Sequence, residues 1–191
     1  MAVMESKGSA EAKKVIEREV HGDGIVRFVG IVLDAKTVCH VTELVDLGTL
    51  IKVLAENAVG AEMKLKMMWD VAKGIKTLRS FNVIHRDLKA GNVLCKITDF
   101  GISRPAESVF AMAMTRGQGT PLFMAPEIPG GQKRYSKAVD VYSYGILCSV
   151  IWNNGEMPSS ESNFQTVLAL QNEIVQGTRP SIQNVPPQLE R

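Results

Sequence analysis

The chain has 191 residues, of which 45% are hydrophobic and 22% are charged, values near the averages for soluble globular proteins. This composition excludes an intrinsically disordered chain and allows one large domain or two small lobes. The 22 Lys and Arg residues against 20 Asp and Glu residues give a net charge of +2, which argues neither for nor against nucleic acid, and no block of like charges marks a basic groove.

Neither a membrane span nor an export signal is predicted. The longest apolar run, near residues 144–152, is interrupted by a serine and is too short to cross a bilayer. Residues 1–14 lack the apolar run of a signal peptide. Cys39, Cys95 and Cys148 are odd in number and form no C-x-x-C pair, so we expect buried thiols in a reducing compartment. We therefore expect a cytoplasmic protein.

The amino-terminal part of the chain is expected to contain short strands. Residues 11–20 carry aliphatic side chains among charged ones, a short helical pattern, and Asp23-Gly24 predicts a turn. Two β-rich runs follow, at residues 25–33 and 37–44, with three residues between them. This arrangement predicts a hairpin.

The rest of the chain is expected to be mainly helical. A short helix is predicted over Leu50–Glu56 with Thr49 as its N-cap, followed by an amphipathic helix over residues 61–81. A more apolar helix is predicted over residues 136–152 and another over residues 163–176. The expected buried face of the amphipathic helix consists of Leu65, Met68, Val71, Ala72, Ile75 and Leu78.

Residues 82–130 show turn residues and little periodicity, and such a stretch in a compact domain is usually functional or disordered. It contains HRDLKAGN at 85–92, DFG at 99–101 and GTPLFMAPE at 119–127. In this order the three segments resemble the catalytic loop, the magnesium-binding triplet and the end of the activation segment of eukaryotic protein kinases. One triplet alone would be a weak indication, whereas the succession of three is specific.

The resemblance extends over nearly the whole chain and implies an α+β, protein-kinase-like bilobal fold. Residues 1–45 would form a reduced amino-terminal β lobe with the hinge, and residues 46–191 a mainly helical carboxy-terminal lobe without the family's last helices. Lys89 and Thr120 resemble the serine/threonine-specific members. The segment VTELVDLGTL at 41–50 resembles the hinge of tyrosine-kinase-like enzymes.

The resemblance also implies the catalytic and metal-binding residues. Phosphoryl transfer depends on positioning and on neutralisation of negative charge. Asp87 would accept the proton of the attacking hydroxyl, and Lys89 would place a cation near the transferred phosphate. Thr120, in the segment typical of serine/threonine kinases, completes the predicted catalytic residues. Asn92 and Asp99 would supply oxygen ligands to Mg²⁺, which would bridge the phosphates of ATP.

The residues implied in ATP binding lie nearer the amino terminus. Thr42 would be the gatekeeper, and the backbone of Glu43 and Val45 would bond the adenine edge. Glu19 fits best as the glutamate that pairs with the family's ATP-binding lysine, and Glu11 is the alternative.

Other residues are expected to support the site. His85 is expected to pack and hydrogen-bond under Phe100 and not to act as a base. Asp140, in the apolar helix, would hold the backbone of the catalytic loop. Thr115 and Ser108 are candidate phosphorylation sites that could pair with the arginine after His85, although each could equally be an ordinary loop residue.

The chain also departs from the family pattern. It has no G-x-G-x-x-G, Met4 stands where the ATP-binding lysine belongs, and Lys7 would face the other side of a strand. Only residues 21–24 separate the helical pattern that contains Glu19 from the next predicted strand. Residues 93–98 join the predicted metal ligands, where a minimal hairpin needs about eight residues. Glu127 would lack its arginine, and a buried carboxylate without its partner costs about 3–5 kcal/mol.

Three functional interpretations follow. The intact catalytic loop predicts a serine/threonine kinase that uses ATP and Mg²⁺ on a protein substrate, with neither nucleic acid nor membrane as a partner. Met4 and the missing glycine-rich loop instead predict a non-catalytic pseudokinase that binds a protein partner. The third interpretation is an incomplete fragment whose longer parent is active.

Overall fold

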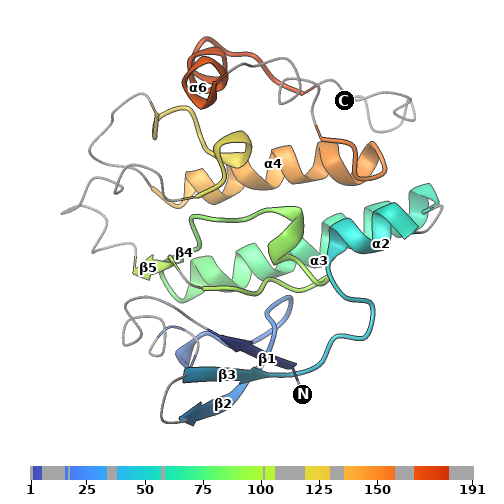
Figure 1. Ribbon diagram of the computed structural model, residues 1–191, viewed down its shortest axis with the longest axis vertical. Coiled ribbons are helices and arrows are strands. Elements are labelled where there is room, and N and C mark those ends of the chain that lie inside the picture. The colour runs from blue at the N-terminus through green and yellow to red at the C-terminus, as the bar shows by residue number, and fades with distance from the viewer. Residues whose placement is uncertain are drawn as a thin grey trace.

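The computed structural model describes residues 2–5, 16, 18–33, 38–56, 59–100, 102–105, 119–129, 136–157 and 166–180. A small sheet lies at one end of this part of the molecule, and a set of helices lies beyond it (Figure 1). This arrangement confirms the predicted α+β architecture. The predicted residues that lie outside the described ones are Lys7, Glu11, Gly101, Ser108 and Thr115.

The amino-terminal sheet has three antiparallel strands, β1 (Ala2–Glu5), β2 (Phe28–Leu33) and β3 (Val38–Thr42). Their order is β1-β3-β2, so β3 is central. The predicted hairpin is confirmed as β2 and β3. Strand β2 starts at Phe28 and not at residue 25 as predicted. Ile25 pairs elsewhere, in a parallel bridge with Ile97.

Four helices are described, α2 (Leu50–Glu56), α3 (Ala61–Ser80), α4 (Ala138–Trp152) and α6 (Val167–Val175). The first three confirm the predicted helices to within two residues at each end. The described helix α6 begins later than predicted because the side chain of Thr166 accepts a hydrogen bond from a backbone N–H of the first turn, as an N-cap does.

The buried face of α3 is rotated relative to the prediction. Leu65 is 42% exposed, whereas Lys64 and Met67 are buried. A lysine can be buried here because its ammonium donates a hydrogen bond of 2.7 Å to the carbonyl of Trp152 at the end of α4. Gly74 is buried on the same face, where the Gly24 carbonyl and the Ile97 side chain leave no room for a Cβ. The members of the predicted face that are buried are Val71, Ile75 and Leu78.

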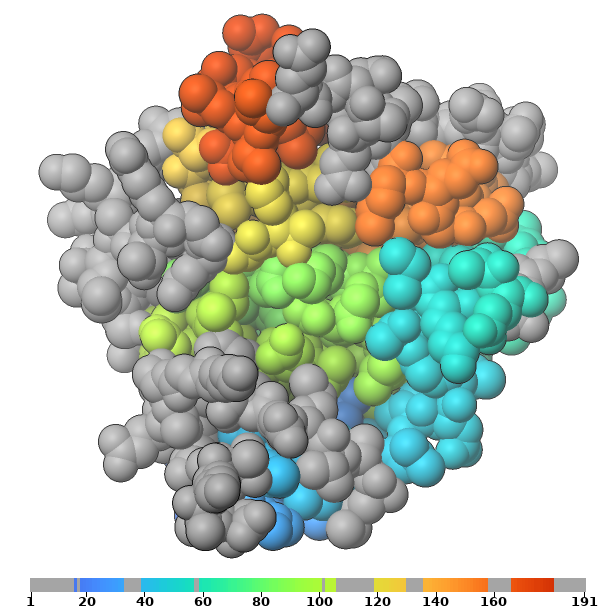
Figure 2. Space-filling view, in the orientation of Figure 1, coloured from blue at the N-terminus to red at the C-terminus, as the bar shows by residue number. Residues whose placement is uncertain are grey.

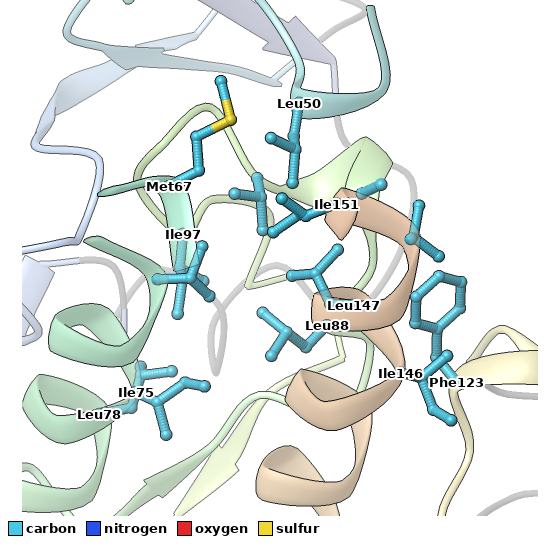
Figure 3. Close-up of a cluster of buried hydrophobic side chains, with 14 of the residues drawn as sticks. Leu50, Met67, Ile75, Leu78, Leu88, Ile97, Phe123, Ile146, Leu147 and Ile151 are labelled. Atoms are coloured by element: carbon cyan, nitrogen blue, oxygen red, sulfur yellow. The ribbon is translucent and has the colours of Figure 1, made fainter. Parts of the chain in front are cut away.

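One hydrophobic core joins the helices to the irregular segment (Figure 3). Leu50 comes from α2, and Leu147 and Ile151 come from α4, where both are fully buried. Leu88 and Ile97 come from the irregular segment and are 1% and 0% exposed. Burial of each such side chain contributes about 1.5–3 kcal/mol. The irregular segment is therefore part of the core, which fixes the backbone on either side of its polar residues.

Helix α4 is the most apolar of the described helices, as predicted, and packs against α3 and the short helical turn η3 (Pro121–Phe123). Its 15 residues fall short of the roughly 20 that a bilayer requires. Nowhere in the described ranges does a helix combine the length and the apolar character needed to cross a membrane. The three cysteines form no disulfide, and they are half-buried where buried thiols were expected.

Candidate active site

Two short strands bring the ends of the irregular segment together. β4 (Val83–Ile84) pairs antiparallel with β5 (Arg104–Pro105). The predicted catalytic loop, which begins at residue 85, therefore starts beside the segment that follows Phe100. A single helical turn, η1 (Ala90–Asn92), follows and is closed by a hydrogen bond of 2.9 Å from Asn92 N–H to the Lys89 carbonyl. The polar residues of the predicted catalytic loop therefore lie on backbone that is itself hydrogen-bonded.

Asp140 of α4 holds the start of this loop, as predicted. Its carboxylate accepts the backbone N–H of His85 at 2.8 Å and that of Arg86 at 3.0 Å. Arg86 has a φ of 74°, a conformation that a side-chain-bearing residue adopts only with compensation. Burial raises the pKa of Asp140, although the two N–H groups favour its charged form. The carboxylate thus stabilises a strained turn in the loop.

The buried His85 connects the predicted catalytic loop to the segment that carries Asp99. Its Nε2–H donates to the Thr98 carbonyl at 2.9 Å, and its Nδ1 accepts the Asp87 backbone N–H at 3.3 Å, which together define the tautomer. The ring packs on Phe100 with centroids 5.4 Å apart, which confirms the predicted packing role. The buried hydroxyl of Ser103 also donates to the His85 carbonyl at 3.1 Å.

The three predicted catalytic side chains form a closed hydrogen-bonded cluster. The Lys89 ammonium lies 2.9 Å from Oδ2 of Asp87 and donates to the Thr120 hydroxyl at 3.0 Å. The Thr120 hydroxyl in turn donates to Oδ1 of Asp87 at 3.0 Å. Figure 2 shows the segments that carry these residues side by side on one face, residues 83–100 in green and 119–129 in yellow. The structure therefore unites residues 33 positions apart in sequence.

Asn92 completes this cluster. Its Nδ2 donates to the backbone carbonyl of Asp87 and to Oδ2 of the same residue, each at 3.0 Å. The Asp87 carboxylate is thus oriented by a hydroxyl, an ammonium and an amide, and 16% of its side chain stays exposed. Such a carboxylate can accept a proton from a hydroxyl that approaches from solvent, beside a cation that can neutralise a nearby anion.

The connection between Asn92 and the predicted second metal ligand forms a small hairpin, which corrects the expectation that it is too short. Val93 and Ile97 form an antiparallel bridge, and Thr98 N–H donates to the Asn92 carbonyl at 3.1 Å. A turn of three residues suffices because Cys95, at its centre, has a φ of 55°. Six residues therefore suffice for one antiparallel bridge and a tight turn, although not for the two three-residue strands on which the count of eight was based.

The predicted metal ligands lie at the open end of this hairpin. Both side-chain bonds of Asn92 use its nitrogen, so its amide oxygen accepts no hydrogen bond within the described part of the chain. Asp99 follows Thr98 directly and has a φ of 61°, which aspartate tolerates better than most residues. An amide oxygen and a carboxylate are ligands that Mg²⁺ prefers. The described residues contain no group of three His, Cys, Asp or Glu side chains that could hold a metal without a substrate.

The predicted hinge, residues 41–50, begins within the last two residues of β3. The Thr42 hydroxyl, half-buried, donates to the Glu43 carbonyl at 3.2 Å, and Glu43 N–H donates to the Arg27 carbonyl at 2.9 Å. The Val45 carbonyl accepts Gly48 N–H at 3.2 Å, while the N–H of Val45 donates to no described residue. Of the backbone predicted to bond adenine, the N–H of Glu43 is therefore occupied within the protein, whereas that of Val45 is available.

Glu19 is not part of the cluster. It is exposed next to the buried Val20, and its carboxylate makes no hydrogen bond or ion pair with the described residues. β1 does lie in the sheet beside β3, with Met4 opposite His40 in the register. The structure thus gives Glu19 no contact with the predicted catalytic residues.

Glu127 is less buried than predicted. It is only partly buried, so it remains in contact with water. The predicted penalty for a buried carboxylate without its arginine therefore does not apply, because that penalty requires removal of the charge from solvent.

Sequence reasoning missed an ion pair between the hinge and the hairpin. The Lys96 ammonium lies 2.6 Å from Oε1 of Glu43. The hydrogen bond from Lys96 lowers the pKa of Glu43, against the opposing effect of burial. No local pattern relates these residues, which are 53 positions apart, so no sequence signal could have identified the pair.

Comparison with known proteins gives consistent matches. Residues 4–190 match the family model for protein tyrosine and serine/threonine kinases. The chain is 35% identical over 178 residues to the Arabidopsis thaliana serine/threonine-protein kinase STY17, an alignment that covers 87% of the chain and 30% of the relative. It is 34% identical over 144 residues to the serine/threonine-protein kinase CTR1 of the same plant, covering 69% of the chain and 17% of the relative.

A protein of Acanthamoeba polyphaga mimivirus is 36% identical over 176 residues, which cover 86% of the chain and 10% of that protein. The chain thus spans about a tenth to a third of the length of these curated relatives.

Proposed function

The chain belongs to the family of protein tyrosine and serine/threonine kinases, and on this premise we propose that it transfers the γ-phosphate of ATP to a serine or threonine hydroxyl of a protein substrate. One observation carries the proposal: the hydroxyl of Thr120 donates to Oδ1 of Asp87 at 3.0 Å, beside the Lys89 ammonium. The carboxylate is therefore placed to accept a hydrogen bond from a hydroxyl, which is what a base for alcohol phosphorylation must do.

Each residue of the cluster has a role in this reaction. Asp87 orients the substrate hydroxyl and accepts its proton, and Lys89 neutralises negative charge on the phosphate that is transferred. Asn92 and Asp99 would hold Mg²⁺, which when bound neutralises the charge of the ATP phosphates. The N–H of Val45 would bind the adenine edge. We also propose a cytoplasmic location, where ATP and protein substrates are both available.

A second candidate function is that of a non-catalytic kinase relative that binds a protein partner. It is favoured by Met4, which lies in β1 beside β3 and which the sequence resemblance places where the family has its ATP-binding lysine. The exposed carboxylate of Glu19 likewise has no cation among the described residues. Both observations concern the amino-terminal part of the chain, whereas the cluster around Asp87 supports catalysis.

The two candidates are separated by a phosphotransfer assay with labelled ATP, Mg²⁺ and a mixture of dephosphorylated casein and myelin basic protein, with identification of the modified residue type. We expect phosphoserine or phosphothreonine, and Asp87→Asn should lower the rate by about 10²–10⁴-fold because it removes the base. Glu56→Gln, the same chemical change at an exposed site in α2, should leave the rate unchanged.

A thermal-shift measurement with Mg-ATP accompanies the assay. A raised melting temperature together with transfer to serine or threonine supports the kinase proposal, and transfer only to tyrosine contradicts it. Folded protein that shows neither a shift nor transfer supports the non-catalytic candidate.

A further inference from the structure

The hinge and the hairpin that carries the metal ligands are joined by the ion pair of Glu43 and Lys96. The ammonium of Lys96 lies 2.6 Å from Oε1 of Glu43, and the two side chains are 41% and 23% exposed. Glu43 stands two residues before Val45, whose N–H is available for a nucleotide base. Lys96 stands in the turn between Asn92 and Asp99. The pair thus connects the expected adenine end of the site with its expected metal end.

Glu43 is itself held by a third segment. Its Oε1 also accepts the backbone N–H of Arg27 at 3.0 Å, and its own N–H donates to the Arg27 carbonyl at 2.9 Å. Three hydrogen bonds therefore fix both the backbone and the carboxylate of Glu43. The hydrogen bond from Lys96 is also the main reason for its lowered pKa, so the carboxylate remains charged at neutral pH.

The backbone at Lys96 is also held by hydrogen bonds. Its carbonyl accepts Leu94 N–H at 2.8 Å across the turn, and the next residue, Ile97, exchanges backbone hydrogen bonds with the strand-like segment before Arg27. In these bonds Ile97 N–H donates to the Gly24 carbonyl at 2.7 Å, and Val26 N–H donates to the Ile97 carbonyl at 2.9 Å.

These contacts form a closed ring. It runs from Arg27 to Glu43 through hydrogen bonds, to Lys96 through the ion pair, to Ile97 along the chain, and back through Val26 to Arg27. The ion pair is the only link of the ring that consists of two side chains, so one substitution can open the ring there. Because the hairpin is only six residues long, a displacement of its turn is transmitted directly to the residues on either side.

We propose that Lys96 and Glu43 are positioning residues that set the distance between the adenine-binding backbone and the magnesium ligands. This inference rests on the proposed function. ATP with Mg²⁺ would contact both ends of the site, whereas adenosine would contact only the hinge. Loss of the ion pair should therefore weaken binding of Mg-ATP and leave binding of adenosine nearly unchanged.

The test compares Lys96→Met, which keeps the length of the side chain without its charge, with Lys96→Arg, which keeps the charge. Dissociation constants for Mg-ATP and for adenosine are measured by calorimetry, together with KM for ATP and kcat. We expect Lys96→Met to raise the dissociation constant and KM for Mg-ATP roughly two- to fivefold, the range that partly exposed ion pairs produce. Adenosine binding and kcat should change by less than about 1.5-fold, and Lys96→Arg should behave as wild type.

Lys52→Met provides the matched control, because Lys52 forms an exposed ion pair with Glu56 in α2, outside the ring. It should leave both dissociation constants unchanged. Wild-type protein that binds Mg-ATP while Lys96→Met binds it equally well would overturn the positioning role and leave the proposed function intact. Equal weakening of Mg-ATP and adenosine would overturn it as well, since that result indicates a damaged hinge. Wild-type protein that binds neither ligand would overturn both proposals.

Discussion

Replacement of Asp140 by alanine removes the carboxylate that accepts the backbone N–H groups of His85 and Arg86. Asp140 is 2% exposed and His85 is fully buried, so water cannot take the place of the carboxylate without rearrangement of the loop. The φ of 74° at Arg86 then loses its compensation. We therefore expect both a loss of stability and a local loosening of the catalytic loop.

The expected size follows from the two bonds. A hydrogen bond to a charged group contributes about 1.5–3 kcal/mol, so two such bonds contribute about 3–6 kcal/mol. Burial raises the pKa of Asp140, which means that its charged form retains a desolvation penalty that offsets part of this gain. We expect Asp140→Ala to lower the free energy of unfolding by about 3 kcal/mol. Asp140→Asn should lower it by about 2 kcal/mol, because its amide oxygen can still accept one N–H.

Urea denaturation followed by the fluorescence of Trp69 and Trp152 measures these differences. Val141→Ala, at the next position of α4 and 43% exposed, is the control and should change stability by less than about 0.5 kcal/mol. Hydrogen exchange at the amides of residues 85 and 86 should accelerate in Asp140→Ala. An Asp140→Ala variant within 1 kcal/mol of the control, with both amides still protected, would refute the reasoning.

Three further substitutions test the packing and the electrostatics. Gly74→Ala places a Cβ 2.5 Å from a facing carbonyl oxygen and should lower the free energy of unfolding, measured with urea, by about 1–3 kcal/mol. The Cβ of Gly145→Ala meets nothing within 4 Å, so this variant should raise the free energy of unfolding by about 0.5–1 kcal/mol. Effects of the same sign would contradict this. Leu147→Ala, at a fully buried position, should lower the free energy of unfolding by about 2–5 kcal/mol, and a change below 1 kcal/mol would show that the site is not core. The pKa of Glu43 is lowered in the folded protein, so the stability that Lys96 provides should depend on pH. The difference in melting temperature between wild type and Lys96→Met should be present above the ordinary glutamate pKa of about 4.3 and should be lost as the pH falls through the pKa of the folded state. A difference that persists in acid would count against the ion pair.

Local pattern predicted most of the elements. The spacing of apolar residues located α3 and α4 to within two residues at each end, because helix formation depends on contacts three and four residues apart. The predicted buried face of α3 was partly wrong, because Leu65 is exposed and Lys64, which was not predicted, is buried. Hydrophobicity alone could not reveal that the carbonyl of Trp152 accepts a hydrogen bond from a buried lysine 88 positions away.

The sequence by itself determined which residue types stand in the candidate site and in what order, since Asp87, Lys89 and Asn92 lie within one short loop. Only the tertiary structure decided that Thr120 reaches Asp87 and that Lys96 reaches Glu43. Both contacts join segments far apart in the chain, and their distances depend on how the core packs between those segments. Packing energy is a property of the whole arrangement and not of any local spacing, so a sequence pattern cannot specify such distances.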